Sequence, residues 1–199
     1  HHGDHVGGNI DLKKKYKSKV ICSSYEAKKI PVADIEKSDG EKFILGETIF
    51  KIIHLPGHTL GHIAFYSENA GVIFTGDTLF SLGCGRIFEG TYQQMFESLE
   101  KIKSLSKKTM IYCGHEYTNN NASFCLSIDK DNKKLQNKIE DIRHKIEQKI
   151  PTLPVSLEDE LETNIFLRCD NVKIKNSLKM DNRSKLEVFK KLRNLKDNF

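Results

Sequence analysis

The front part of the chain, up to about residue 115, alternates short apolar runs with turns that contain glycine. Runs rich in β-branched and aromatic residues are typical of strands, and the turn residues between them end each strand. His62–Ser67 and Val72–Thr75 are expected to pair as a hairpin across the turn Glu68–Gly71. Further strands are expected at Val20–Tyr25, Phe43–Leu45, Thr48–Leu55 and Met110–Cys113.

Helical periodicity appears once in this front part and dominates the rest of the chain. Thr91 and Gln94 have the spacing of a capping box, and apolar residues from Tyr92 to Ile102 follow at the helical period. The pattern predicts a mixed α+β domain over residues 1–119 and an all-helical domain over residues 120–199. Helices of the second domain are expected around Leu135, Ile139, Ile142 and Ile146, after a cap formed by Ser156 and Asp159, and along Leu186, Phe189, Leu192 and Leu195.

The composition narrows the class of protein. Hydrophobic residues make up 38% and charged residues 30% of the 199 positions. No run approaches the roughly 20 apolar residues that a membrane helix needs. The five cysteines include no CxxC pair, which argues against a disulfide framework and against a zinc ribbon. We therefore expect a reducing compartment, the cytoplasm, with an organellar form left open.

The net charge of +5 lies mostly in the back of the chain, where residues 120–199 contain 17 basic and 13 acidic residues. Lysine-rich, solvated helix faces are one explanation. Few aromatic residues are interleaved with the basic ones, which argues against a nucleic-acid surface. A small anionic substrate is the more economical partner for so modest an excess. We expect no nucleic-acid or membrane partner, and a monomer.

Histidine placement carries the chemical information, because seven of the eight histidines lie in or near glycine-rich turns. His2, Asp4 and His5 fall within four residues, and neutral imidazoles with a carboxylate suit zinc, iron or manganese. In a loop, these three side chains can reach two neighbouring ions. A purification tag is the weaker alternative, because a tag is an uninterrupted run of histidine.

Three more candidate ligands follow predicted strands. His58 lies between Gly57 and Gly61, Asp77 follows an apolar strand, and His115 comes directly after Gly114. His62 begins the next strand and is equally well explained as a residue that supports a ligand or packs in the core. Strand ends converge at one edge of a sandwich, and six ligands exceed what one tetrahedral ion takes. The count favours two ions bridged by a carboxylate, an arrangement that serves hydrolysis.

This pattern resembles the signature of the metallo-β-lactamase superfamily, T-H-x-H-x-D-H followed downstream by His, Asp and His. Three further segments resemble the glyoxalase II (hydroxyacylglutathione hydrolase) family within it, and the resemblance covers essentially the whole chain. It implies an αββα sandwich with a C-terminal all-helical domain. The three segments are Gly76–Thr91, Gly114–Thr118 and Asn164–Arg168.

The chain departs from the signature at its start, since the first signature histidine would fall two places before His2. The resemblance therefore implies an N-terminally truncated member that also lacks the strands preceding the motif. His1 then occupies the variable position and is not a ligand. The resemblance implies that one ion is bound by His2 and His58, the histidine ligands of that site that this chain contains. The other keeps Asp4, His5 and His115, with Asp77 bridging.

The activity implied by the resemblance is metal-dependent hydrolysis of S-D-lactoylglutathione, a thioester, to D-lactate and glutathione in methylglyoxal detoxification. The implied cofactor is two divalent metal ions, zinc, with iron or manganese as alternatives. They generate the attacking hydroxide from water. Asp4 and Asp77 are the catalytic candidates. The substrate-binding candidates are Arg86, Phe88, Tyr117, Arg193 and Lys196, although basic residues at a helix end also serve the helix dipole.

Three other functions are compatible with parts of this pattern. A persulfide dioxygenase-type enzyme with one iron shares much of the histidine pattern, but it lacks the helical appendage of residues 120–199. A ribonuclease-type member of the superfamily would need a nucleic-acid surface, and the sequence of this chain does not predict one. A non-catalytic, truncated protein that binds glutathione conjugates stays open because the first signature histidine is absent.

Overall fold

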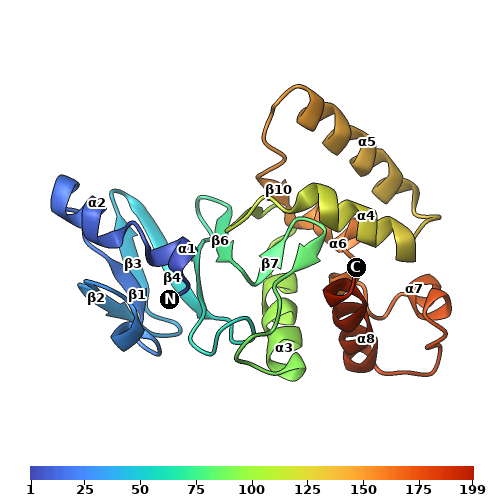
Figure 1. Ribbon diagram of the computed structural model, residues 1–199, viewed down its shortest axis with the longest axis horizontal. Helices are drawn as coiled ribbons and strands as arrows, with labels where there is room; N and C mark the ends of the chain where they lie inside the picture. Colours follow the sequence, from blue (N-terminus) through green and yellow to red (C-terminus); the bar gives the residue numbers. More distant parts are fainter.

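A computed structural model describes all 199 residues. Its centre is a six-stranded sheet with the strand order β10-β9-β6-β5-β4-β3 (Figure 1). The predicted hairpin is confirmed, with Phe65 opposite Phe74, and β6 then pairs in parallel with β9. The strands are β3 (Lys42–Leu45), β4 (Thr48–His54), β5 (Ile63–Ser67), β6 (Val72–Gly76), β9 (Met110–Cys113) and β10 (Val155–Ser156).

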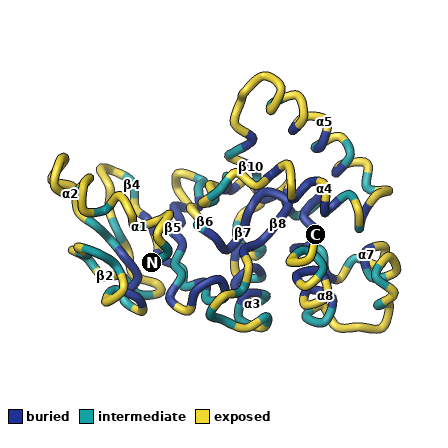
Figure 2. The backbone as a smooth tube through the Cα atoms, in the orientation of Figure 1, coloured by how far each residue is buried: buried dark blue, intermediate teal, exposed yellow.

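Helix α3 (Tyr92–Lys103) begins where its sequence predicts. The Thr91 hydroxyl accepts a hydrogen bond from the backbone N–H of Gln94, and the Gln94 side chain accepts one from the N–H of Thr91. Capping satisfies N–H groups that have no partner within the helix. The apolar face of α3 is buried in a core that continues from the sheet into the C-terminal helices (Figure 2).

The N-terminal part contains two short helices and a small parallel sheet. The helices are α1 (Gly3–Val6) and α2 (Asn9–Tyr16), the strands are β1 (Ile21–Ser23) and β2 (Ile35–Lys37), and the 3-10 turn η1 (Ala27–Lys29) lies between the strands. The prediction that the first histidine cluster lies in a loop is wrong. His2 has an extended backbone that caps α1, and the N–H of Gly7 closes the turn on the carbonyl of Gly3.

The helical part is larger than its sequence pattern predicts. Helices α5 (Lys133–Glu147), α6 (Leu157–Thr163) and α8 (Lys185–Asp197) match the predictions, whereas α4 (Thr118–Ile128) and α7 (Val172–Ser177) were missed. The sequence of α4 includes three consecutive asparagines, which favour turns. Burial of Asn121, Phe124 and Cys125 overrides this preference.

The two parts share elements, because β10 follows α5 yet extends the central sheet beside β9. The division between residues 119 and 120 stays a prediction. A tight hairpin of β7 (Leu79–Phe80) and β8 (Gly83–Cys84) lies between the sheet and the helices, next to η2 (Ile165–Leu167). None of the helices combines the length and the apolar character that crossing a bilayer requires.

Candidate metal centre and substrate pocket

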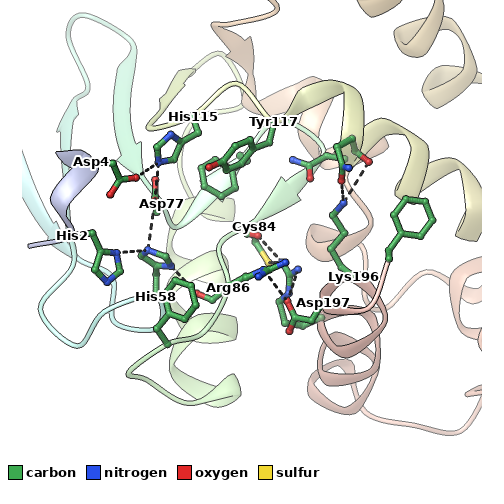
Figure 3. A pocket seen from close by; sticks show the side chains of 16 residues that line it. His2, Asp4, His58, Asp77, Cys84, Arg86, His115, Tyr117, Lys196 and Asp197 are labelled. Atoms are coloured by element: carbon green, nitrogen blue, oxygen red, sulfur yellow. Dashed lines mark hydrogen bonds and ion pairs between the residues drawn. The ribbon is translucent and has the colours of Figure 1, made fainter.

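The structure brings all six candidate ligands together from four separate segments. Figure 3 shows five of them, His2, Asp4, His58, Asp77 and His115, beside the pocket. One segment is α1 with its cap, and the others are the loop after β4, the turn after β6 and the end of β9. Segments from a helix and from three strand ends thus converge on one point, as a metal site on a rigid scaffold requires. The six residues are His2, Asp4, His5, His58, Asp77 and His115.

Asp77 lies at the middle of this cluster. Its Oδ2 atom is 3.2 Å from Nε2 of His5, and 3.4 Å from Nε2 of both His58 and His115. The side chain is buried, and its other oxygen, Oδ1, has no hydrogen-bond partner. A buried carboxylate oxygen without a partner costs stability unless a cation satisfies it. The cluster therefore fits divalent metal ions.

The remaining ligands form a group on each side of Asp77. Nδ1 of His2 lies 3.2 Å from Nε2 of His58. On the other side, Nε2 of His115 lies 3.2 Å from Oδ2 of Asp4 and 3.2 Å from Nε2 of His5. The ligand atoms of Asp4, His5 and His115 all fall within 4.8 Å of one another, close enough to share one ion.

The backbone around Asp77 is shaped to admit its carboxylate. Gly76 has a φ of +48°, in the left-handed region that favours glycine, and a Cβ there would collide with the ring of His62. A Cβ on Gly114 would collide with Oδ1 of Asp77. These two glycines allow the strand ends of β6 and β9 to approach closely enough for one carboxylate to lie between three imidazoles.

His62 lies behind the turn that carries Asp77. Its Nε2 accepts a hydrogen bond from the backbone N–H of Asp77 at 3.1 Å, and its Nδ1 lies 3.2 Å from the hydroxyl of Thr78. Burial, with the neighbouring His58 adding to it, lowers the pKa of His62 to about 4. A neutral ring can accept from the N–H of Asp77. Of the two explanations left open by the sequence, the geometry favours support of a ligand.

A pocket of about 570 Å³ opens beside the cluster and is lined by all five predicted substrate-binding residues. Several further residues that line the pocket are not predicted by the sequence pattern. Asn120 and Asn121 lie in the helix α4 that was not predicted, and Asp197 lies one helical turn after Arg193. The pocket is also lined by Phe80, Cys84 and Phe199.

Aromatic rings flank the ligands on both sides. The ring of Phe88 is 5.1 Å from that of His58, and Phe88 remains 62% exposed. The ring of Tyr117 stacks on that of His115 at 4.9 Å, with Phe80 against its edge. Exposed rings on both sides of the cluster can hold the apolar parts of a substrate.

Three cations line the side of the pocket away from the ligands, with Arg86 and Lys196 in its wall and Arg193 in its floor. Arg86 is exposed, and its Nε lies 3.7 Å from Oδ1 of Asp197. Lys196 is half-buried and bonds to Asn120. Its burial, together with the nearby charges of Arg193 and Arg86, lowers the pKa of Lys196. One carboxylate against three cations leaves this wall positive, which suits an anionic ligand.

Arg193 differs from the other two cations because it is only 3% exposed. Its Nη1 donates to the carbonyl of Cys84 at 2.6 Å, its Nη2 lies 3.0 Å from Asp197, and its Nε has no partner. The guanidinium therefore forms the floor of the pocket and also holds the neighbouring backbone.

Comparison with known proteins assigns both parts of the chain. Residues 1–115 match the family described as Metallo-beta-lactamase superfamily, and residues 116–199 match Hydroxyacylglutathione hydrolase C-terminus. The hydroxyacylglutathione hydrolase of Pelagibacter ubique is 52% identical over 199 residues, all of this chain and 77% of that protein. The protein of the same name from Chelativorans sp. is 45% identical, over all of this chain and 78% of its own length.

The fold agrees with a solved structure. ETHE1 from Myxococcus xanthus superposes with a TM-score of 0.64 at 21% identity, covering 98% of this chain and 65% of that one. This likeness concerns the fold alone. Together with the match of residues 1–115, it confirms the predicted metallo-β-lactamase-like α+β fold with a helical C-terminal region.

Proposed function

The chain belongs to the hydroxyacylglutathione hydrolase family of the metallo-β-lactamase superfamily, a family of thioester hydrolases, and from this premise we propose how its own residues act. The substrate is an S-2-hydroxyacylglutathione, S-D-lactoylglutathione foremost, and the products are D-lactate and glutathione. The observation that carries the proposal is the position of Asp77, whose Oδ2 lies within 3.4 Å of three imidazoles from three segments.

Two divalent ions fit the donor set on either side of Asp77. His2 and His58 would hold one ion and Asp4, His5 and His115 the other, with Asp77 between them. When bound, such ions lower the pKa of water so that hydroxide forms near neutral pH, and they polarise the carbonyl under attack. Imidazole and carboxylate ligands suit zinc, with iron and manganese as alternatives.

The pocket residues orient the thioester. We place the glutathione carboxylates at the positive wall formed by Arg86, Lys196 and the Arg193 floor. The rings of Phe88 and Tyr117 flank the acyl group, so that the thioester carbonyl lies at the ligand cluster. Holding the carbonyl beside the attacking group supplies the proximity on which the rate depends.

The chain's own thiol in the pocket is not the nucleophile. Cys84 lines the pocket but is buried, and this burial raises the pKa of its thiol. A protonated thiol is a poor nucleophile. Hydrolysis through activated water needs no covalent enzyme intermediate, and the ligand cluster supports that route.

The helical part decides between the hydrolase and the dioxygenase-type alternative. Residues 116–199 match the hydroxyacylglutathione hydrolase C-terminus and supply Tyr117, Arg193 and Lys196 to the pocket. A centre with one iron would leave one of the two ligand groups around Asp77 without a role. We further propose that the protein acts as a monomer in the cytoplasm.

The test combines turnover with metal analysis. We expect purified protein to bind two ions per chain and to hydrolyse S-D-lactoylglutathione, followed by loss of the thioester absorbance. Lys145 is partly exposed and pairs with Asp141 on α5, far from the ligands in sequence, so Lys145→Ala serves as the control. Two bound ions with no turnover would support the non-catalytic alternative, and oxygen consumption with a persulfide would support the dioxygenase.

A further inference from the structure

Side chains of the helical part hold the turn of the β7–β8 hairpin in addition to its own backbone pairing. The backbone carbonyl of every residue from Phe80 to Cys84 accepts a hydrogen bond from one of them. The donors are Asn164 to Phe80 and Gly83, Asn121 to Ser81, Cys125 to Leu82, and Arg193 to Cys84, at 2.6–3.3 Å. A surface hairpin would leave such carbonyls to water, so this turn depends on the helices around it.

Glu160 completes this arrangement from α6. It is fully buried, and its Oε2 accepts from the N–H of Leu82 at 2.8 Å and from Asn164 at 2.9 Å. Its Oε1 accepts from Lys138 at 2.7 Å and from the hydroxyl of Ser81 at 3.2 Å. A buried charge is tolerated only when paired and hydrogen-bonded, and every acceptor position of this carboxylate is used.

The hydrogen bond from Leu82 fixes an unfavourable backbone conformation. Leu82 has a φ of +57°, in the left-handed region that costs a non-glycine residue about 1 kcal/mol or more. Such a conformation persists only where its surroundings over-determine it. Glu160 binds the N–H of this residue and Cys125 binds its carbonyl, so the helical part determines the shape of the turn.

The same segment continues directly into the metal centre. The N–H of Gly85 donates to the carbonyl of Thr78 at 3.1 Å, and the carbonyl of Arg86 accepts from Nδ1 of His58 at 2.7 Å. At its other end, the ring of Phe80 packs against Tyr117. The segment from Phe80 to Arg86 therefore connects the helical part to one ligand and one wall of the pocket.

We propose that Glu160, Asn164 and Lys138 form a positioning cluster that sets the Phe80–Arg86 segment, and through the Arg86 carbonyl orients His58 for metal binding. The helical part thus contributes to the metal centre as well as to substrate binding. None of the three residues lines the pocket. The proposal rests on the proposed function only for its kinetic readout.

The decisive variant is Glu160→Gln, which keeps the size of the side chain but replaces one acceptor oxygen by a donor facing Leu82 or Lys138. Its matched control is Glu162→Gln, because Glu162 pairs with Lys134 and so joins the same two helices, α6 and α5, but is only partly buried. Zinc is titrated into the metal-free proteins by calorimetry, and amide exchange is followed at Leu82.

We expect Glu160→Gln to weaken binding of one of the two zinc ions by about tenfold or more, the loss typical of changes behind a metal ligand. Exchange at the Leu82 amide should accelerate by more than the exchange of core amides in α3, and kcat should fall more than KM rises. Glu162→Gln should leave zinc affinity, exchange at the Leu82 amide and the kinetic constants unchanged. Equal zinc affinities in both variants, or exchange that accelerates uniformly across the protein, would overturn the proposal.

A milder change covers the case in which Glu160→Gln does not fold. Cys125→Ala removes the donor to the carbonyl of Leu82, together with one buried sulfur atom, and should give the same effects at smaller size. Because zinc titration and amide exchange need no thioester, they separate the two ideas. Wild-type zinc binding without hydrolysis counts against the proposed function, whereas full zinc affinity in both variants counts against the positioning cluster.

Discussion

Nδ1 of His58 donates a hydrogen bond to the backbone carbonyl of Arg86 at 2.7 Å. This bond fixes the ring so that Nε2 faces Asp77. A hydrogen bond on the far nitrogen is the usual way in which a protein orients a metal-binding histidine. Arg86 therefore serves the centre with its backbone and the pocket with its side chain, and the two roles can be separated.

Replacing Arg86 by alanine should affect the substrate and spare the metals. Arg86→Ala keeps the carbonyl that orients His58 but removes an exposed cation from the positive wall. We expect KM to rise about two- to tenfold, the effect of one partly screened charge, with the metal content unchanged. Steady-state kinetics and elemental analysis measure both quantities.

Arg183→Ala is the control for this variant, since Arg183 is an exposed arginine that pairs with Glu187 at the start of α8. It should leave KM at the wild-type value. Loss of metal from Arg86→Ala would show that the side chain, and not the backbone carbonyl alone, holds the position of His58.

The central position of Asp77 makes it the most demanding ligand to replace. Asp77→Ala removes the one carboxylate oxygen that lies near ligands of both groups, His58 on one side and His5 on the other. Replacing a residue that only hydrogen-bonds to a metal ligand already lowers metal affinity or activity by about 10–100-fold. For the ligand itself we therefore expect at least about a 100-fold loss of kcat and a lower metal content. Two ions retained per chain would count against the bridging role.

Arg193 and Lys196 should respond differently, although their spacing predicts a single clamp. Arg193 is buried and bonded to Cys84 and Asp197. Arg193→Ala should therefore lower the free energy of unfolding by about 2–4 kcal/mol. It should also raise KM more than it lowers kcat. Lys196→Ala should raise KM with little loss of stability. Urea unfolding and steady-state kinetics on both variants test this. A stable Arg193→Ala enzyme would contradict the role of Arg193 as the floor of the pocket.

Short-range patterns in the sequence predicted most of the ligand cluster. Strand runs that end in glycine placed His58, Asp77 and His115 at strand ends, and these ends do converge. Helix α1 was not predicted because a turn of only four residues has no periodicity to detect. The pattern is too short for the helical period to show.

The residues behind the site were harder to predict. Glu160 lies in an acidic run at the start of α6, where carboxylates ordinarily face solvent and complement the helix dipole. Asn164 belongs to the segment Asn164–Arg168 that resembles the family, yet its bonds to Phe80 and Gly83 join positions about 80 residues apart. Contacts at this separation arise from the packing of the whole chain, which local periodicity does not encode.

The support that His62 gives to Asp77 leads to a last prediction. Nε2 of His62 accepts from the backbone N–H of Asp77, and this bond helps to hold the turn that carries the central carboxylate. His62→Leu removes the acceptor and should weaken zinc binding by about 10–100-fold. The amide oxygen of His62→Gln can reach the place of Nε2, so this variant should recover much of the affinity. Zinc titration of the two metal-free variants provides the comparison, with unfolding curves as the check on stability. If the leucine and glutamine variants bind zinc equally well, the bond to Asp77 has no part in holding the metal, and His62 is a packing residue.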